Sequence, residues 1–449
     1  MAWDFETDPE FQKKLDWIEE FMADEVEPIS HLGMAVWGSE GRERFIKPLQ
    51  AKVKEKGLWA CHLGPELGGQ GYGQLKLALM NEKLGRNHLA PTIFGCQAPD
   101  TGNAEIIAHY GTPEQKEKWL WPLLNSEIRS AFSMSEPAGG SDPTTFKTRA
   151  EWKNGKWVIN GEKYFSSGAY GSTILIVYAV TDPDHKDIHQ RTSIFIVPTK
   201  TPGVNILRGI GVGAGEGGGH AYIRYEDVEV GPEALLGPRG GAFLVAQTRL
   251  SGGRVHHAMR TVGACQKAFD LMCQRAVSRQ TRDGRLADMA VVQEQICDAW
   301  IQLQQFRLLV LRTAWLIDKH KDYNLVRKDI AAIKVAMPKV YHDIAATAAH
   351  LHGAMGVSNE MPFMGMLTSA MVMGIADGPT EVHKVTVAKQ VLKDYRPDND
   401  LFPNYHLPKL KEAAKDKYAA EIAELKAHYD ARRAPNENAS GATQTHPAH

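Results

Sequence analysis

Apolar residues near the N-terminus recur every three or four positions, which is the spacing of an amphipathic helix. The clearest example has apolar residues at Phe11, Leu15, Ile18 and Met22. Farther along, Thr112 offers a capping hydroxyl and Pro113 suits the first helical position, so we expect a helix to begin there. The pattern predicts an N-terminal α-helical domain over residues 1–130.

The pattern changes at about residue 131 to short β-branched or aromatic runs, separated by clusters of Gly, Pro, Asn and Asp. Such runs predict strands rather than helices. Asn154-Gly155 and Asn160-Gly161 are strong turn signals between these runs. We therefore expect a central β domain over residues 131–240.

Long helical stretches return over residues 241–395, and their broad apolar content predicts helices that pack in a bundle. The tail, residues 396–449, combines a helix of alternating charge with a polar end that we expect to be disordered. Because the elements run α, then β, then α, the chain is predicted to be a multi-domain α+β protein.

Composition narrows the possible partners. The 449 residues include 52 Lys and Arg against 53 Asp and Glu, so no basic surplus favours nucleic acid. No stretch approaches the ~18 uninterrupted apolar residues of a membrane span. The five cysteines form no C-x-x-C pair, and the acidic start has no secretory or transit pattern. We expect free thiols, a cytoplasmic location, no nucleic-acid partner and no membrane insertion.

A glycine-rich stretch at residues 209–219 contains the formal pattern G-x-G-x-x-G at Gly213, Gly215 and Gly218. A dinucleotide-binding fold needs a helix after this pattern, whereas a strand pattern follows here. We therefore expect a loop between two strands.

Four histidines suggest a metal site at first sight: His256, His257, His350 and His352. Adjacent histidines on a helix point in different directions, and no Cys or carboxylate stands beside them at ligand spacing. We expect no bound metal.

The main chemical signal lies in residues 132–169, which begin FSMSEPAGGSD and end INGEKYFSSGA. A turn rich in Ser and Gly supplies backbone N–H groups and hydroxyls, and a short β unit with an aromatic residue at Phe165 follows. Such a unit could hold the edge and face of a flat ring. On the residues alone, it would equally suit any β-hairpin loop.

The arrangement of these two motifs resembles the acyl-CoA dehydrogenase family, and the resemblance covers roughly residues 5–395. It implies an N-terminal helical domain, a central β-barrel-like domain and a C-terminal four-helix bundle, with FAD as cofactor. The motif residues that the resemblance places against FAD are Phe132, Met134, Ser135, Ser141, Phe165 and Ser167. Phe165 and Ser167 would cover the flavin ring and bond near its N5, and Ser141 would contact either the flavin phosphates or the pantetheine arm. The family more often has Trp at position 165 and Thr at 135 and 167.

The resemblance also assigns substrate and interface residues. Ser251, Arg254 and Gly378 match positions that contact the substrate. Further FAD contacts are implied for Arg279, Thr281, His350, Gly353, Ala354, Thr380 and Glu381. Because the contacts at 279–281 and 350–354 belong to the FAD of a neighbouring subunit, the resemblance implies a homodimer or homotetramer.

The string IADGPTEVHK places Asp377 where the family carries its catalytic base, most often a Glu. An Ala-Asp-Gly-Pro string marks a subgroup, and RVHHAMRTVG fits the same one. Some members carry their base instead at the position of Gly253, which cannot serve here. The alternative role for Asp377 is a helix cap or an ion pair.

The resemblance implies α,β-dehydrogenation of an acyl-CoA thioester. Asp377 would remove the α-proton, the β-hydride would pass to the flavin, and an electron-transferring flavoprotein would accept the electrons. Three departures from the family pattern, at Arg282, Thr368 and Pro379, leave open a catalytically impaired flavoprotein subunit of the same fold. An acyl-CoA oxidase is a further alternative. The sequence specifies neither the length nor the branching of the acyl chain.

Overall fold

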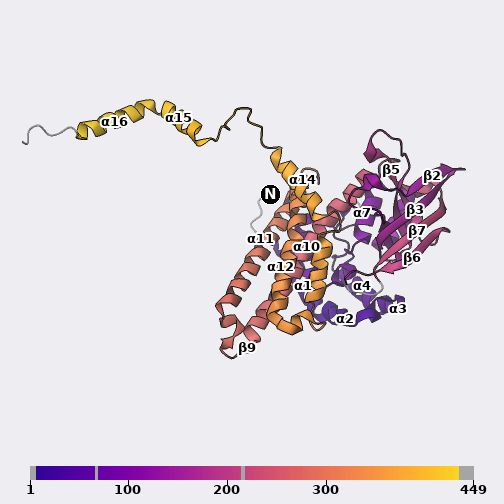
Figure 1. Ribbon diagram of the computed structural model, residues 1–449. Helices are drawn as coiled ribbons and strands as arrows, with labels where there is room; N and C mark the ends of the chain where they lie inside the picture. The colour runs from indigo at the N-terminus through magenta and orange to yellow at the C-terminus, as the bar shows by residue number, and fades with distance from the viewer. Residues whose placement is uncertain (1–6, 66–68, 214–217, 434–449) are drawn as a thin grey trace, which may run out of the picture. The chain divides into compact units, whose positions relative to one another are not determined.

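The computed structural model describes residues 7–65, 69–213 and 218–433 (Figure 1). The chain divides into two units, residues 1–390 and residues 391–449, and each is described by itself. Within the described ranges, no helix has the length and apolar content needed to cross a lipid bilayer.

The first unit begins with a helical layer. Its α-helices are α1 (Pro9–Phe21), α2 (Glu27–Ser30), α3 (Ser39–Gly41), α4 (Lys47–Glu55), α5 (Gly73–Leu84), α6 (Ala90–Ile93), α7 (Asp100–Tyr110), α8 (Pro113–Gln115) and α9 (Trp121–Leu124). The predicted apolar stripe of α1 is buried, and Thr112 caps α8 through a reciprocal pair of hydrogen bonds with Gln115. The helix start predicted at Thr112 is therefore confirmed.

A mixed sheet follows, built from β1 (Ser130–Ser133), β2 (Arg149–Lys153), β3 (Lys156–Ser167), β4 (Ile174–Val180), β5 (Thr192–Pro198), β6 (Val204–Ile210), β7 (His220–Val230) and β8 (Leu235–Leu236). The strands are ordered β6-β7-β3-β2-β4-β5-β8, and β1 pairs with β4 in parallel. The expected barrel-like domain is thus an open sheet that does not close on itself. Its strands β4 and β5 are buried along almost their whole length.

One of the two predicted turns is correct and the other is wrong. Asn154 and Gly155 both have positive φ and form the turn between β2 and β3, as expected. Asn160 and Gly161 instead lie inside β3, where the pairing with β7 shifts register. The physical reason is a β-bulge: Gly161 has φ +144°, and a Cβ atom there would lie 2.6 Å from the Cα of Thr148.

The loop expected at 209–219 does lie between two strands, since β6 ends at Ile210 and β7 begins at His220. Gly213 and Gly218 belong to that connection, whereas Gly215 lies outside the described residues.

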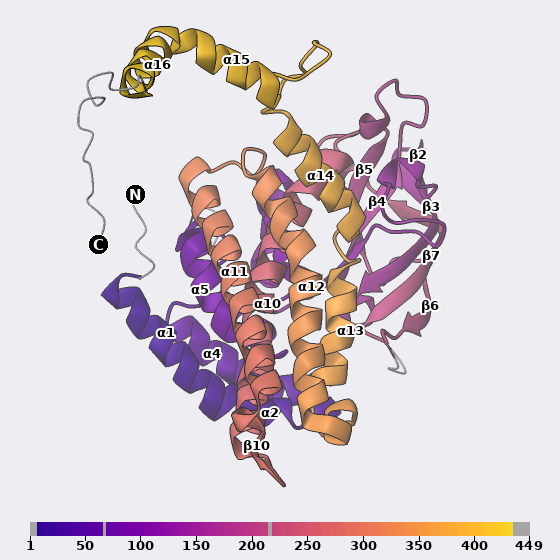
Figure 2. The ribbon, with the colours of Figure 1, turned by 60° about the vertical axis from the view of Figure 1, so that its left-hand side comes forward.

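The C-terminal part of the first unit is helical (Figure 2). It contains α10 (Ala242–Ser278), α11 (Ala290–His320), α12 (Arg327–His352), α13 (Phe363–Met373) and α14 (Thr380–Leu392), with the hairpin β9 (Gln280–Thr281) and β10 (Gly284–Arg285) after α10. Helices α10, α11, α12 and α13 pack against one another, and α10 also contacts α5 and α7 of the N-terminal layer. The predicted order of helices, sheet and helices is confirmed.

The second unit contains α15 (Leu407–Lys417) and α16 (Ala419–Arg433). The pattern of alternating charge is thus helical, as predicted, but Tyr418 separates two helices instead of lying within one. The polar end predicted to be disordered falls on residues 434–449, outside the described residues.

Candidate active site

The connection between α13 and α14 carries Asp377 in a left-handed backbone conformation. Asp377 has φ +56° and the next residue, Gly378, has φ +103°. Left-handed backbone is uncommon for a residue with a side chain, although Asp tolerates it better than most. Strain of this kind costs on the order of 1–3 kcal/mol and concentrates at functional sites. Asp377 combines this conformation with a side chain that is only 19% exposed, unlike a surface acid.

Two side chains hold the Asp377 backbone in place. Arg254 donates from Nε to the Asp377 carbonyl at 2.9 Å, and Nε2 of His383 lies 3.2 Å from the same oxygen. The Asp377 N–H makes no hydrogen bond to any described residue. The carbonyl of Asp377 is thus held by side chains, while its N–H is left without a partner among the described residues.

The Asp377 carboxylate, whose side chain is 19% exposed, faces α10. Its Oδ2 lies 3.7 Å from Nε2 of His257, and a Cβ atom built on Gly253 would lie 3.2 Å from the same oxygen. The structure thus brings together Asp377, Arg254 and Gly253. The expected base is therefore a spatial neighbour of the position at which some family members carry theirs.

Four cations on two helices influence this carboxylate. Arg249, Arg254 and Arg260 on α10 and Lys334 on α12 all interact electrostatically with Asp377. Burial lowers the pKa of Lys334 to about 8, and it lowers the pKa values of His257 and His383 to about 4, so both histidines are neutral at pH 7. Arginine stays charged at any working pH. The surplus of positive charge suits a ligand or intermediate that carries negative charge.

A second group of predicted residues lies at the adjoining ends of β1 and β3. Ser133 and Ser166 share a hydrogen bond of 2.9 Å between their Oγ atoms, and the Tyr164 N–H donates to the Ser135 carbonyl at 3.0 Å. These contacts bring the segment 132–135 beside the segment 165–167, although thirty residues separate them in the chain.

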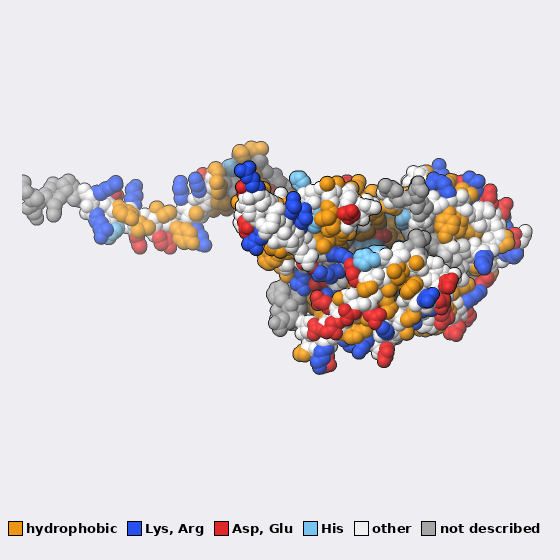
Figure 3. Space-filling view, turned by 90° about the horizontal axis from the view of Figure 1, so that it is seen from below, with side chains coloured by type: hydrophobic (Ala, Val, Ile, Leu, Met, Phe, Trp, Pro, Cys, Tyr) orange, Lys and Arg blue, Asp and Glu red, His pale blue; other side chains and the backbone are white. Residues whose placement is uncertain are grey.

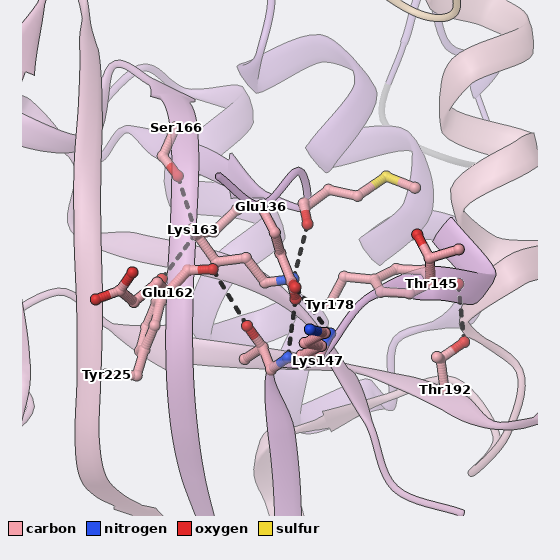
Figure 4. Close-up of polar contacts among 12 residues, drawn as sticks. Glu136, Thr145, Lys147, Glu162, Lys163, Ser166, Tyr178, Thr192 and Tyr225 are labelled. Carbon is pink, nitrogen blue, oxygen red and sulfur yellow. Dashed lines mark hydrogen bonds and ion pairs between the residues drawn. The ribbon is translucent and has the colours of Figure 1, made fainter. Parts of the chain in front are cut away.

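A buried ion pair supports this junction from within the sheet (Figure 4). The fully buried Nζ of Lys163 donates to the Met134 carbonyl at 2.7 Å and to Oε1 of Glu136 at 3.0 Å. Glu136 also accepts from the N–H groups of Lys147 and Thr148, at 2.7 and 2.9 Å. Burial lowers the pKa of Lys163 to about 8, against the opposing effect of Glu136. The pair fixes the backbone next to Ser135.

Phe165 is the second strained residue of the site. It has φ +59°, and its side chain is 45% exposed. Its ring packs edge to face against Tyr164 at 4.3 Å and His220 at 5.7 Å, and His220 Nδ1 is 2.8 Å from Oγ of Ser167. An exposed aromatic ring flanked by the hydroxyl of Ser167 fits the face and edge of a flat heteroaromatic ring such as a flavin.

Arg249 links the two groups. Its guanidinium lies 3.9 Å from the centre of the Phe132 ring, and its Nε donates to Asn103 at 3.0 Å. The same cation interacts with the charge of Asp377. The β1 end and the Asp377 loop therefore share one arginine. Nothing in the local sequence pattern predicts this role of Arg249, because its partners lie far away in the chain.

Beside α10 lies a cavity of about 640 Å³. Its wall includes Ser251, a predicted substrate contact, together with Glu105, Gln247 and Tyr323, but neither Asp377 nor Phe165. Burial raises the pKa of the Glu105 carboxyl to about 8. Figure 3 shows a face of the molecule that is hollowed near its centre, where histidine, basic and acidic side chains meet.

The remaining predicted residues divide into two sets. Thr380 and Glu381 begin α14 three and four residues after Asp377, and Ser141 is exposed in the turn that follows Glu136. The other set lies toward the far ends of the helices. Arg279, for example, follows the end of α10 and comes 25 residues after Arg254, which corresponds to about 38 Å along a helix. The predicted residues that lie at or beyond the C-terminal ends of α10 and α12 are Arg279, Thr281, His350, Gly353 and Ala354.

Comparison with known protein families gives three matches along the chain. Residues 8–127 match the acyl-CoA dehydrogenase N-terminal domain, residues 131–228 the middle domain and residues 240–392 the C-terminal domain. The matches therefore include both segments that meet at the site.

Among curated proteins, the chain is 40% identical over 353 residues to the probable acyl-CoA dehydrogenase FadE2 of Mycobacterium tuberculosis, covering 78% of this chain and 86% of that protein. It is 38% identical over 360 residues to mouse acyl-CoA dehydrogenase family member 11, covering 79% of this chain and 46% of that protein. The chain thus spans less than half of the mouse relative.

Solved structures show the same fold. A proposed acyl-CoA dehydrogenase from Mycobacterium abscessus superposes with a TM-score of 0.82 at 34% identity, covering 87% of this chain and 100% of that one. Butyryl-CoA dehydrogenase from Megasphaera elsdenii superposes with a TM-score of 0.74 at 23% identity, over 87% and 100% of the two chains. The second likeness shows the fold alone.

Proposed function

Because the chain belongs to the acyl-CoA dehydrogenase family, whose members are flavoprotein oxidoreductases acting on CH–CH groups, we propose that it dehydrogenates an acyl-CoA thioester at the α and β carbons. Asp377 is the base in this proposal. FAD is the cofactor, and an electron-transferring flavoprotein is the electron acceptor.

One observation carries the proposal. The carboxylate proposed as base and the aromatic residue proposed to cover the flavin, Asp377 and Phe165, are both non-glycine residues in left-handed backbone. They come from segments more than 200 residues apart, yet Arg249 interacts with Asp377 and contacts Phe132 beside the Phe165 segment. Strain retained on both sides of one site is what a preorganised reaction centre needs.

The residues of this chain have distinct tasks in the reaction. The Asp377 carboxylate accepts the α-proton, and the unpartnered Asp377 N–H donates to the thioester oxygen. Arg249, Arg254, Arg260 and Lys334 interact with the charge of Asp377, and their positive charge would favour negative charge that develops beside it. Bound FAD supplies the hydride-accepting chemistry.

The residues that would hold FAD within one chain are Phe132, Met134, Ser135, Ser141, Phe165, Ser167, Thr380 and Glu381. Their aromatic surfaces and hydroxyl groups suit the ring and its polar edge. Ser251, Arg254 and Gly378 would contact the acyl-CoA. Ser251 also lines the cavity beside α10, which offers room for part of the substrate.

We further propose a homodimer or homotetramer. Arg279, Thr281, His350, Gly353 and Ala354 lie beyond the C-terminal ends of α10 and α12 or near them, and they would hold FAD bound mainly to a neighbouring subunit. Large apolar side chains on α11 and α13 are exposed, including Trp300, Ile301, Leu308 and Met371. Exposed apolar surface of this kind is typical of an association surface.

The test is anaerobic flavin bleaching. Purified protein loaded with FAD is mixed with a panel of acyl-CoAs, and we expect at least one of them to bleach the flavin. Asp377→Asn keeps the left-handed backbone, since Asn tolerates it, and should retain FAD while losing bleaching. Asp227→Asn is the matched control, because Asp227 also has positive φ, +48°, but lies exposed on β7. Bleaching by Asp377→Asn at the wild-type rate would refute the base, and a wild type that no acyl-CoA bleaches would refute the reaction.

A further inference from the structure

The adjacent histidines of α10 point into different surroundings. His256 is 5% exposed, its ring packs edge to face against His62 at 6.4 Å, and its Nε2 has no partner among the described residues. His257 instead directs Nε2 toward Oδ2 of Asp377 at 3.7 Å. Only one histidine of the pair therefore faces the proposed base.

We propose that His257 is a positioning residue for Asp377: it holds the Oδ2 side of the carboxylate against α10, so that Oδ1 is the oxygen that receives the α-proton. This inference rests on the proposed function. His257 itself neither gains nor loses a proton in the reaction, because the proton moves from the α carbon to Oδ1 of Asp377.

The geometry separates the two carboxylate oxygens. His257 Nε2 and the space above Gly253 both adjoin Oδ2, whereas Oδ1 accepts no hydrogen bond from any described residue. A separation of 3.7 Å is too long for a hydrogen bond, so a small rotation of either side chain is needed to close it. An imidazole N–H donated to Oδ2 would then fix the rotamer of Asp377.

The charges around His257 explain why a neutral imidazole suits this task. Arg249 and Arg260 face it along α10, Lys334 faces it from α12, and Asp377 faces it from the loop before α14. Burial and then Arg260 lower its pKa to about 4, against the opposing effect of Asp377. An imidazolium would form an ion pair that strongly favours the ionised carboxylate and so weakens it as a base, whereas a neutral N–H orients the carboxylate and favours its ionised form less.

The backbone of Asp377 is held separately from its carboxylate. Arg254 and His383 both contact the Asp377 carbonyl, and neither forms a hydrogen bond to the carboxylate. Loss of His257 should therefore free the side chain without releasing the loop. This division makes the inference testable by substitution.

The experiment compares His257→Gln with His257→Met, two side chains of similar size of which only the first has an N–H donor. With Met, we expect flavin reduction to slow by about 10- to 100-fold, the effect of one lost hydrogen bond to a charged group. The acid limb of the pH–rate profile should also move to higher pH, because an N–H donor stabilises the ionised carboxylate. With Gln, we expect most of the rate and the wild-type position of the acid limb to be retained. FAD content and KM should be unchanged in both variants.

His256→Gln and His256→Met are the matched controls, and both should react at the wild-type rate if they fold. A crystal structure of the His257→Met protein should show the Asp377 carboxylate rotated away from Gly253. Equal rates for Gln and Met, an unmoved acid limb, or two variants that do not fold would each overturn the positioning role. These outcomes are distinguishable from failure of the proposed function, in which the wild type is not bleached or Asp377→Asn remains active.

Discussion

Gly253 leaves the space that the Asp377 carboxylate occupies: a Cβ atom on Gly253 would lie 3.2 Å from Oδ2 of Asp377. Contacts between 3.0 and 3.4 Å are tighter than most contacts that a real Cβ makes, so one neighbour must give way. The position of the Asp377 carboxylate therefore depends on the absence of a side chain at Gly253, although the two residues are more than 120 positions apart in the chain.

Gly253→Ala should slow flavin reduction by about 10-fold, because the added methyl group displaces the carboxylate from its position against α10. The free energy of unfolding should hold or rise by up to about 1 kcal/mol, since Ala is the better helix residue. Stopped-flow reduction and urea unfolding measure the two effects. Gly365→Ala on α13 is the control, because nothing lies within 4 Å of a Cβ there. A Gly253→Ala protein with the wild-type rate would show that the carboxylate position does not matter.

Glu105→Gln should stabilise the protein more at pH 8 than at pH 5. Burial raises the pKa of Glu105 from 4.5 to about 8, opposed by Arg249, so between these values the folded state holds a proton that the unfolded state has released. The wild-type free energy of unfolding consequently falls as pH rises from 4.5 to 8, by about 1.4 kcal/mol per pH unit at most, whereas Gln does not titrate. Urea unfolding at both pH values measures the difference. If Glu105→Gln raises the free energy of unfolding equally at pH 5 and pH 8, the pKa of Glu105 is not raised by burial.

Lys163→Met should lower the free energy of unfolding by about 3–5 kcal/mol, because it leaves the Glu136 carboxylate buried without its cation. Adding Glu136→Gln should recover part of this loss, since the amide oxygen can still accept from the backbone N–H groups of Lys147 and Thr148. Lys156→Met is the matched control: Lys156 also lies on β3 and pairs with a glutamate, Glu229, at 2.7 Å, but both are exposed. Its loss should cost below about 1 kcal/mol. Equal losses at 163 and 156 would argue against a buried charge.

Phe165→Ala should weaken FAD binding by about 10-fold, because it removes the aromatic surface proposed to cover the ring. Phe165→Trp should bind FAD at least as well as the wild type. Equilibrium titration with FAD measures both dissociation constants. Trp152→Ala is the control, since Trp152 is half exposed on β2 and has no role in the site. If the alanine variant binds as tightly as the wild type, Phe165 does not contact the cofactor.

Local chemistry predicted much of the fold. The helix start at Thr112 and the buried stripe of α1 depend on side chains a few residues apart, so the sequence alone could specify them. The turn at Asn154-Gly155 is correct for the same reason. Asn160-Gly161 carries the same turn signal, yet it forms a bulge because β7 supplies a partner strand from sixty residues away.

The candidate site depends even more on contacts between residues that lie far apart in the chain. Asp377 and Phe165 were identified through a family resemblance, since neither local pattern marks a reaction centre. Arg249 and His257 were assigned no role, because each acts through a partner more than 100 residues away. Lys163 and Glu136 lie inside the two motifs of residues 132–169, but only the fold reveals that they form a buried pair.

The left-handed backbone at 377 also narrows what mutation can offer there. In a saturation library at this codon, the backbone would favour Gly, Asn and Asp, and only Asp among them brings an ionisable side chain. Selection for stability alone would therefore enrich Gly, whereas selection for turnover would return Asp. The two screens should select different residues at position 377, so the requirements of stability and of catalysis can be measured separately there.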